Sequence, residues 1–294
     1  MNQNRDRWIV STDWLKEHLS APDIVILDAS WHMPDSDRDA HKEYLEGHIP
    51  GALFFDIDDI ADTTDPLPHM LPGPVMFSSR MRKMGIGDGN RVVVYDSHGL
   101  MTAARVWWTF RVMGHDDVAI LDGGLPKWRA EGGTIETGPP PPRQERHFTS
   151  RRQTTMVCSQ DDTADMSRSG IGTIIDARSA GRFAGDEPEP REGLRSGHIP
   201  ASINVPYKDL LNDDGTLRKT EEIRAAFARS GNNLAGPIIT TCGSGVTAAV
   251  LALGLEILGH KQIALYDGSW TDWGAATDLP IETGAPNRNG PDPS

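Results

Sequence analysis

The chain has 294 residues, of which 37% are hydrophobic and 24% charged, and its formal net charge at pH 7 is −13. This length is enough for two domains, and the acidic balance argues against a nucleic-acid-binding protein without excluding a locally positive cleft. No apolar run is long enough to span a membrane, and the first residues lack the apolar core of a secretory signal. Only two cysteines occur, Cys158 and Cys242, so we expect no disulfide framework and a cytoplasmic protein.

Short apolar strands alternate with helical segments through the first half of the chain. A helical segment that begins at Ser11 precedes a β-branched strand at 24–28, and a strand at 53–55 follows His48-Ile-Pro. The later elements that we expect are a helix around 76–84, a strand at 91–96, a helix at 102–113, a strand at 118–122 and a helix that contains Trp128. This alternation predicts an α/β domain with a mostly parallel β-sheet flanked by helices.

A proline-rich stretch separates the two halves of the chain. Pro139 to Pro142, with the arginine-rich residues that follow, predict a stiff, exposed linker over 138–152. We therefore expect one domain over residues 8–137, a second over 153–283, and a tail over 284–294.

The second half repeats the first. Three pairs of landmarks lie 145 residues apart: Gly114-His115 and Gly259-His260, Asp122 and Asp267, Trp128 and Trp273. Upstream the offset is 148 for Leu27-Asp-Ala-Ser against Ile175-Asp-Ala-Arg, and 150 for the two His-Ile-Pro elements. One domain has thus been duplicated. Features in both copies are expected to be structural, and features in one copy are candidates for chemistry.

The strongest candidate for chemistry is Cys242. It follows an apolar run, which predicts a buried strand, and precedes a long apolar helix that ends at Gly259. Gly243 and Gly245 allow the loop to turn backbone N–H groups inward, and the helix N-terminus adds partial positive charge. Both effects stabilise a thiolate, so we interpret Cys242 as a nucleophile rather than as a buried core cysteine. The first copy has Ser97 at the equivalent position.

The tandem copies, the Gly-His-Ile-Pro elements and the strand–Cys–loop–helix unit resemble the two-domain rhodanese sulfurtransferases. The loop Cys242-Gly-Ser-Gly-Val-Thr247 is similar to that of 3-mercaptopyruvate sulfurtransferases, whereas thiosulfate-using members usually carry Cys-Arg-Lys-Gly-Val-Thr. Matching features run from about residue 8 to residue 274. The resemblance implies two tandem rhodanese-like domains, of which the N-terminal one is non-catalytic and the C-terminal one catalytic, with the active site between them.

The resemblance also implies which residues bind the substrate. Gly181-Arg182-Phe183 and the segment that ends at Arg191 match the substrate clamp of the family. Guanidinium forks bind planar carboxylates bidentately, so Arg182 and Arg191 are expected to hold a 2-keto acid; otherwise they are surface arginines. The loop residues Gly243, Gly245, Val246 and Thr247 complete the expected binding set.

We expect the Cys242 thiolate to take the sulfur of 3-mercaptopyruvate and form a persulfide while pyruvate leaves as its enolate. Ser244 is placed to relay a proton to the enolate, and the resemblance implies a Ser–His–Asp relay. His48 and Asp39 are our assignments for its other members; Asp37 is an alternative to Asp39, and the counterpart of His48 at His198 equally favours a structural histidine. An acceptor thiol, such as that of thioredoxin, or cyanide then removes the outer sulfur. We expect no metal and no organic cofactor.

Three other functions remain open. A thiosulfate:cyanide sulfurtransferase uses the same persulfide, but it would benefit from basic side chains where Gly243 and Ser244 stand. A cysteine phosphatase needs an arginine to close the loop, and that position is Ala248. A rhodanese-like binding or persulfide-sensing module would not require the cysteine together with the two arginines.

Overall fold

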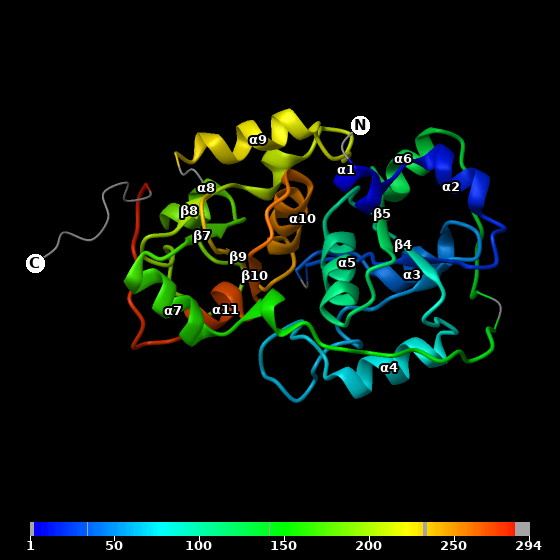
Figure 1. Ribbon diagram of the computed structural model, residues 1–294, viewed down its shortest axis with the longest axis horizontal. Helices are drawn as coiled ribbons and strands as arrows, with labels where there is room; N and C mark the ends of the chain where they lie inside the picture. The colour runs from blue at the N-terminus through cyan, green and yellow to red at the C-terminus, as the bar shows by residue number, and fades with distance from the viewer. Residues whose placement is uncertain (1–2, 34, 141, 232–233, 286–294) are drawn as a thin grey trace, which may run out of the picture. The chain divides into compact units, whose positions relative to one another are not determined.

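The computed structural model describes residues 3–33, 35–140, 142–231 and 234–285, and Figure 1 shows its helices and strands. Most of the predicted tail lies outside the described residues. The chain divides into two compact units. Unit 1 comprises the chain up to Thr64 together with Leu71–Gln153 and Leu211–Leu217, and unit 2 comprises Asp65–Met70, Thr154–Leu210 and the chain from Arg218 onward.

Unit 1 contains a five-stranded sheet in the order β1-β5-β4-β2-β3, and all of its strand pairs are parallel. The strands are β1 (Ile9–Val10), β2 (Ile24–Asp28), β3 (Leu53–Phe54), β4 (Arg91–Tyr95) and β5 (Val118–Leu121). The central strands are short apolar runs because helices cover both faces of a parallel sheet.

Unit 2 repeats this arrangement, with the order β6-β10-β9-β7-β8 and parallel pairs throughout. Its strands are β6 (Val157–Cys158), β7 (Thr173–Asp176), β8 (Ile203–Asn204), β9 (Ile238–Thr241) and β10 (Ile263–Tyr266). The predicted fold, two tandem domains that each contain a mostly parallel sheet, is confirmed.

The helices follow the strands in the same sequence in both units. Unit 1 contains α1 (Gln3–Trp8), α2 (Thr12–His18), α3 (Ala40–Glu46), α4 (Pro74–Lys83), α5 (Thr102–Val112) and α6 (Gly124–Ala130). Unit 2 contains α7 (Gln160–Ser169), α8 (Ala180–Ala184), α9 (Thr220–Arg229), α10 (Ala248–Leu258) and α11 (Ser269–Trp273), with 3₁₀ turns at Thr154–Met156 and Tyr207–Leu210. The helix expected at 76–84 begins earlier, because Pro74 occupies its first turn, where a missing N–H costs nothing.

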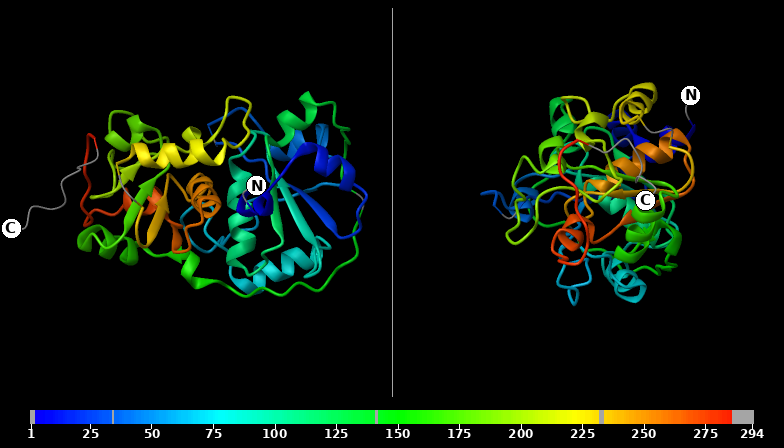
Figure 2. Two further views of the ribbon diagram at one scale, coloured as in Figure 1. Left: turned by 45° about the horizontal axis from the view of Figure 1, so that its top comes forward. Right: turned by 90° about the vertical axis from the view of Figure 1, so that its left-hand side faces the viewer.

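One long helix packs against the middle of each sheet: α5 lies against β4 and β5, and α10 lies against β9 and β10 (Figures 1 and 2). Both helices are buried along almost their whole length. The sequence of α10 is accordingly almost entirely apolar, whereas α5 also contains Arg105 and Arg111, whose guanidinium groups lie over tryptophan rings. Trp128 and Trp273 are buried at equivalent places in the two cores, and each indole N–H donates to a backbone carbonyl, of Thr134 at 2.8 Å and of Pro280 at 2.9 Å. These landmarks are therefore structural. Among the described residues, no helix combines the length and apolar character that a bilayer crossing requires.

Candidate active site

Cys242 lies directly after β9, in the loop that leads into α10. Its side chain is buried, at 2% exposure. The Cys242 N–H donates to Ser269 Oγ at 3.2 Å, and the Cys242 and Gly243 carbonyls accept from the N–H groups of Trp270 and Thr271 at 3.0 and 2.9 Å. The first turn of α11 therefore fixes the backbone on both sides of the thiol.

The rest of the loop forms a tight turn into α10. Gly245 has φ +77°, a left-handed conformation that residues with a side chain rarely adopt, so glycine is required here. A left-handed residue in such a turn directs successive N–H groups to one side, where they stabilise an anion. Ser244 and Val246 are buried, and Thr247 immediately precedes the first residue of α10.

Arg182 reaches the Cys242 loop from α8. A Cβ atom built on Gly243 would lie 3.1 Å from Arg182 Nη2. The guanidinium thus packs against the loop backbone, one residue from the nucleophile, and it occupies the space that a side chain at residue 243 would need. The sequence assigned Arg182 to substrate binding, and the structure places it beside the candidate nucleophile.

A chain of buried charges holds Arg182 in this position. Glu189, whose side chain is 2% exposed, accepts from Arg182 Nη2 at 2.5 Å and from Arg178 Nη1 at 2.7 Å. Arg178 in turn pairs with Asp176 at the end of β7, at 2.7 Å. Burial opposes the charge of Arg178, but Asp176 and Glu189 outweigh this cost and keep its pKa above its ordinary value. Sequence reasoning missed Glu189, although it lies within the Glu-Pro-Glu-Pro-Arg segment that ends at Arg191.

Arg191 lies in the loop that follows α8 and is half-buried. It shares this loop with Glu189, so both predicted clamp arginines come from one segment of unit 2.

His48 and Asp39 have other partners in unit 1. His48 is fully buried; its Nδ1 lies 2.7 Å from the Tyr44 carbonyl oxygen, and its ring stacks on Tyr44 at 4.1 Å. His198 makes the same contacts with Phe183, at 2.8 and 3.8 Å. Asp39 caps α3 by accepting from the Lys42 N–H at 2.9 Å. Among the described residues no hydrogen bond joins Asp39 to His48, and the matched pair of histidines favours a structural role for His48.

The segment Asp65–Met70 supplies a second histidine that sequence reasoning missed. This segment belongs to unit 2, and His69 within it is 6% exposed. His69 has φ +61°, a left-handed conformation that is uncommon outside glycine and recurs at functional sites. Burial, with a smaller contribution from nearby Asp65, raises the pKa of Asp272 in α11. The segment therefore lies close to the helix that fixes the Cys242 loop. The signal was available, because Pro66-Leu-Pro-His69 occurs in only one copy.

In the equivalent loop of unit 1, the backbone N–H groups donate to a carboxylate from the chain itself. The Asp96 side chain is fully buried and accepts from the N–H groups of His98 at 2.8 Å, Met101 at 2.7 Å and Ala103 at 2.9 Å. Unit 2 has Thr241 at this position. The amides that could bind an external anion in unit 1 are thus already hydrogen-bonded.

Comparison with known proteins agrees with this geometry. A model of the rhodanese-like domain matches residues 11–131 and 159–276, and the chain belongs to this family. The 3-mercaptopyruvate sulfurtransferase of Escherichia coli K12 is 44% identical over 94% of this chain and 98% of its own length, and the human 3-mercaptopyruvate sulfurtransferase is 41% identical over 91% and 92%. The thiosulfate sulfurtransferase of Rattus norvegicus is 40% identical over 91% and 92%. The crystal structure of SseA from Escherichia coli superposes with a TM-score of 0.82 at 42% identity and covers 90% of this chain and 98% of that one. The predicted family resemblance is confirmed.

Proposed function

We propose that the protein is a sulfurtransferase that moves the sulfur of 3-mercaptopyruvate to an acceptor through a persulfide on Cys242. The observation that carries this proposal is the packing of the Arg182 guanidinium against Gly243, directly beside the cysteine. A cation in this place can bind the carboxylate of a small acid whose sulfur then faces the thiol. The relatives named 3-mercaptopyruvate sulfurtransferase support the same substrate.

The first half-reaction transfers one sulfur atom. The Cys242 thiolate attacks the thiol sulfur of 3-mercaptopyruvate, an S–S bond forms, and the C–S bond breaks with its electron pair left on carbon. The products are a Cys242 persulfide and the enolate of pyruvate, which becomes pyruvate on taking one proton. Loop amides and the N-terminus of α10 stabilise the negative charge on sulfur.

Arg182 and Arg191 hold the substrate carboxylate in this scheme, and Gly243, Gly245, Val246 and Thr247 form the loop that surrounds the transferred sulfur. Ser244, which is 7% exposed and two residues from the nucleophile, relays the proton to the enolate. A histidine beside Ser244 would supply this proton. We replace His48 with His69 in this role, because His69 belongs to the same unit as Cys242 whereas the contacts of His48 recur at His198.

The second half-reaction returns the enzyme to its thiolate form. An acceptor thiolate, such as that of thioredoxin, or cyanide attacks the outer sulfur, and the Cys242 thiolate leaves. A persulfide or thiocyanate is the product. The Cys242 sulfur is formally oxidised when the persulfide forms and reduced again when the acceptor takes the outer sulfur, so no external oxidant or reductant is consumed.

Thiosulfate is the second candidate donor, and the rat thiosulfate sulfurtransferase among the relatives keeps it in consideration. Thiosulfate is a dianion that must approach a thiolate, so cations at the loop would have to offset the repulsion. Arg182 provides a positive charge beside the loop, which suits a single carboxylate, but Gly243 and Ser244 add none of the further charge that a dianion would need. We therefore expect 3-mercaptopyruvate to be the better donor.

Intact-protein mass spectrometry tests the proposal. Incubation with 3-mercaptopyruvate should add the mass of one sulfur atom, release pyruvate, and be reversed by cyanide or a thiol. Cys242→Ser should abolish both the adduct and turnover, whereas Cys158→Ser should change neither. Cys158 is the matched control because burial raises its pKa to about 12, which leaves almost no thiolate at neutral pH. A persulfide that forms equally well in Cys242→Ser would disprove the assignment.

A further inference from the structure

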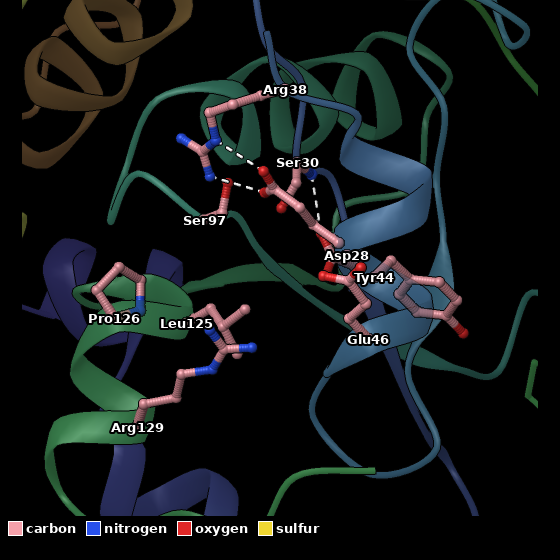
Figure 3. A pocket seen from close by; sticks show the side chains of 10 residues that line it. Asp28, Ser30, Arg38, Tyr44, Glu46, Ser97, Leu125, Pro126 and Arg129 are labelled. Carbon is pink, nitrogen blue, oxygen red and sulfur yellow. Dashed lines mark hydrogen bonds and ion pairs between the residues drawn. The ribbon is translucent and has the colours of Figure 1, made fainter. Parts of the chain in front are cut away.

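Unit 1 contains a cavity of about 300 Å³ that the sulfur-transfer site does not use (Figure 3). Buried side chains form its floor, and exposed side chains, three of them charged, stand at its rim. The floor includes Asp28, Ser30, Tyr44 and Leu125, and the rim includes Arg38, Glu46, Pro126 and Arg129.

The equivalent place in unit 2 is filled by the side chain of Arg178. Its Nε and Nη2 bond Asp176 Oδ2 at 3.0 and 2.7 Å, and Nη2 also donates to the Gly197 carbonyl at 2.8 Å. The guanidinium lies over the Trp270 ring, 4.2 Å from its centroid. The arginine is thus surrounded by two carboxylates, since its Nη1 also donates to Glu189 at 2.7 Å, and by a carbonyl and an aromatic side chain.

Three of these surroundings, Asp176, Gly197 and Trp270, have counterparts in unit 1. Asp28 corresponds to Asp176 at the offset of 148, and Gly47 corresponds to Gly197 at 150. Trp270 is replaced by Leu125, which lines the cavity. The backbone turn is also the same, because the Ser30 N–H donates to Asp28 Oδ1 at 2.9 Å, as the Arg178 N–H does to Asp176 Oδ1 at 2.9 Å.

The residue that corresponds to Arg178 is Ser30, and the cavity is the space that the arginine side chain would occupy. Asp28 remains at its floor, 1% exposed, with the Ser30 amide and the Tyr95 hydroxyl as neutral partners. The Ser30 hydroxyl, in a residue that is 4% exposed, lies near enough to the Asp28 carboxylate to lower its pKa, but it forms no hydrogen bond of regular geometry with a described residue. A buried carboxylate without its cation is costly, and burial accordingly raises the pKa of Asp28.

Arg129 makes only one of the hydrogen bonds that Arg178 makes in unit 2, the one to the glycine carbonyl. Its Nη2 donates to the Gly47 carbonyl at 2.9 Å, but in the described part of the chain it forms no ion pair with Asp28 or any other carboxylate. Arg38, by contrast, is paired with Glu43 through two hydrogen bonds of 2.7 Å. The pocket therefore has an acidic floor, and at its rim Arg129 is available to a ligand carboxylate.

We propose that this pocket binds a small guanidino acid, with the guanidinium group on Asp28 and the Ser30 hydroxyl and with the carboxylate on Arg129. The volume accommodates such a molecule, and the planar donor fork matches the position that Arg178 fills in unit 2. All residues that line this pocket belong to unit 1, and the proposal does not depend on the proposed sulfur transfer.

Isothermal titration of the full chain with 4-guanidinobutyrate tests this proposal. We expect one binding site, with affinity weakened by about tenfold or more in Asp28→Asn, which loses a charge-assisted hydrogen bond. Ser30→Arg should abolish binding, because the installed guanidinium fills the pocket. Ser79→Arg on the exposed face of α4 adds the same charge elsewhere and should bind like the unmodified protein.

The controls distinguish a guanidinium site from a general cation site and from binding elsewhere on the chain. Absence of binding at millimolar ligand, undiminished binding by Ser30→Arg, or equal affinity for 4-aminobutyrate would each overturn the proposal. Circular dichroism checks that the variants fold. If the variants do not fold, amide NMR shifts of the unmodified protein test the site. Addition of 4-guanidinobutyrate should shift the amide signals of Ser30 and Ser97 and leave that of Ser179 unchanged. A shift of Ser179 alone would contradict the site.

Discussion

Glu189 is the residue on which the position of Arg182 depends. It is buried between Arg178 and Arg182 and accepts hydrogen bonds from both. A surface arginine would sample many rotamers, whereas a buried carboxylate fixes this one in a single orientation beside Gly243. Positioning by a neighbouring carboxylate therefore distinguishes Arg182 from the solvated arginines of the chain.

Arg182→Ala should lower kcat/KM for 3-mercaptopyruvate, because a charge-assisted contact to the substrate carboxylate is lost. The expected cost is about 1.5–3 kcal/mol in transition-state binding, which appears chiefly in KM. Steady-state kinetics measure it, and Arg168→Ala on the exposed end of α7 is the matched control. Unchanged kinetics in Arg182→Ala would show that this arginine does not bind substrate.

Glu189→Gln should have a smaller effect of the same kind and should also destabilise the protein. The amide keeps the volume but removes the charge between two guanidinium groups, and thermal unfolding together with KM records both consequences. A loss of stability with an unchanged KM would mean that Glu189 supports only the fold.

Gly243→Arg tests how the loop selects its donor. The new side chain would begin 3.1 Å from Arg182 Nη2, so it must displace that guanidinium. We expect the preference for 3-mercaptopyruvate over thiosulfate to fall by about tenfold or more, equivalent to about 1.4 kcal/mol. The two values of kcat/KM measure the preference, and Gly89→Arg in the exposed turn before β4 controls for charge. An unchanged ratio would remove the steric basis of the donor assignment.

At the scale of elements, the same strand–loop–helix arrangement occurs once in each unit, and the two loops carry different residues. In unit 2 the loop between β9 and α10 follows Thr241 and holds Cys242. In unit 1 the loop between β4 and α5 is closed by Asp96, whose carboxylate accepts three loop amides. The Asp96 carboxylate thus stabilises the loop of unit 1, whereas the loop of unit 2 has Thr241 in place of this carboxylate.

Ser97→Cys should consequently fail to create a second active site. In a Cys242→Ser background, this variant should form no persulfide with 3-mercaptopyruvate, since Asp96 both occupies the amides and repels a thiolate. Intact-mass measurement checks this outcome. An adduct in the double variant would show that the amide set of unit 1 is still open to an anion.

At the scale of the whole molecule, the catalytic unit includes a segment from the first half of the chain. The segment Asp65–Met70 lies in the first half of the sequence but belongs to unit 2. The two units are therefore not built from the first and the second half of the chain alone. The first copy has serine in place of Cys242, and it contributes the segment that contains His69 to unit 2. The proposed mechanism therefore uses residues from both halves of the chain.

His69→Ala and His48→Ala should separate a catalytic histidine from a structural one. We expect His69→Ala to lower kcat by about 10²-fold or more, as the loss of a positioned acid or base does, with little change in thermal stability. His48→Ala should mainly destabilise, because it removes a fully buried ring stacked on Tyr44. A large loss of kcat in His48→Ala, with loss of stability but not of kcat in His69→Ala, would show that His48 is the histidine of the proton relay.

Sequence patterns alone determined much of this protein. Periodicity and internal repeats predicted the duplicated α/β domains, since short apolar strands and offset landmarks such as Trp128 and Trp273 are local signals. The glycine spacing around Cys242 predicted the loop, because Gly245 takes a backbone conformation that few other residues adopt. The difference between Cys242 and Ser97 predicted which copy has the nucleophile.

Only the tertiary structure decided which side chains meet. The contact between Arg182 and Gly243, the burial of Glu189, the carboxylate of Asp96 in its loop and the membership of His69 in unit 2 all join residues that are distant or unremarkable in sequence. Neither composition nor spacing encodes them directly, because each depends on how separate elements pack. The cavity beside Asp28 also depends on packing. The sequence shows Ser30 where the second copy has Arg178, but only the tertiary structure shows that no other side chain fills the space.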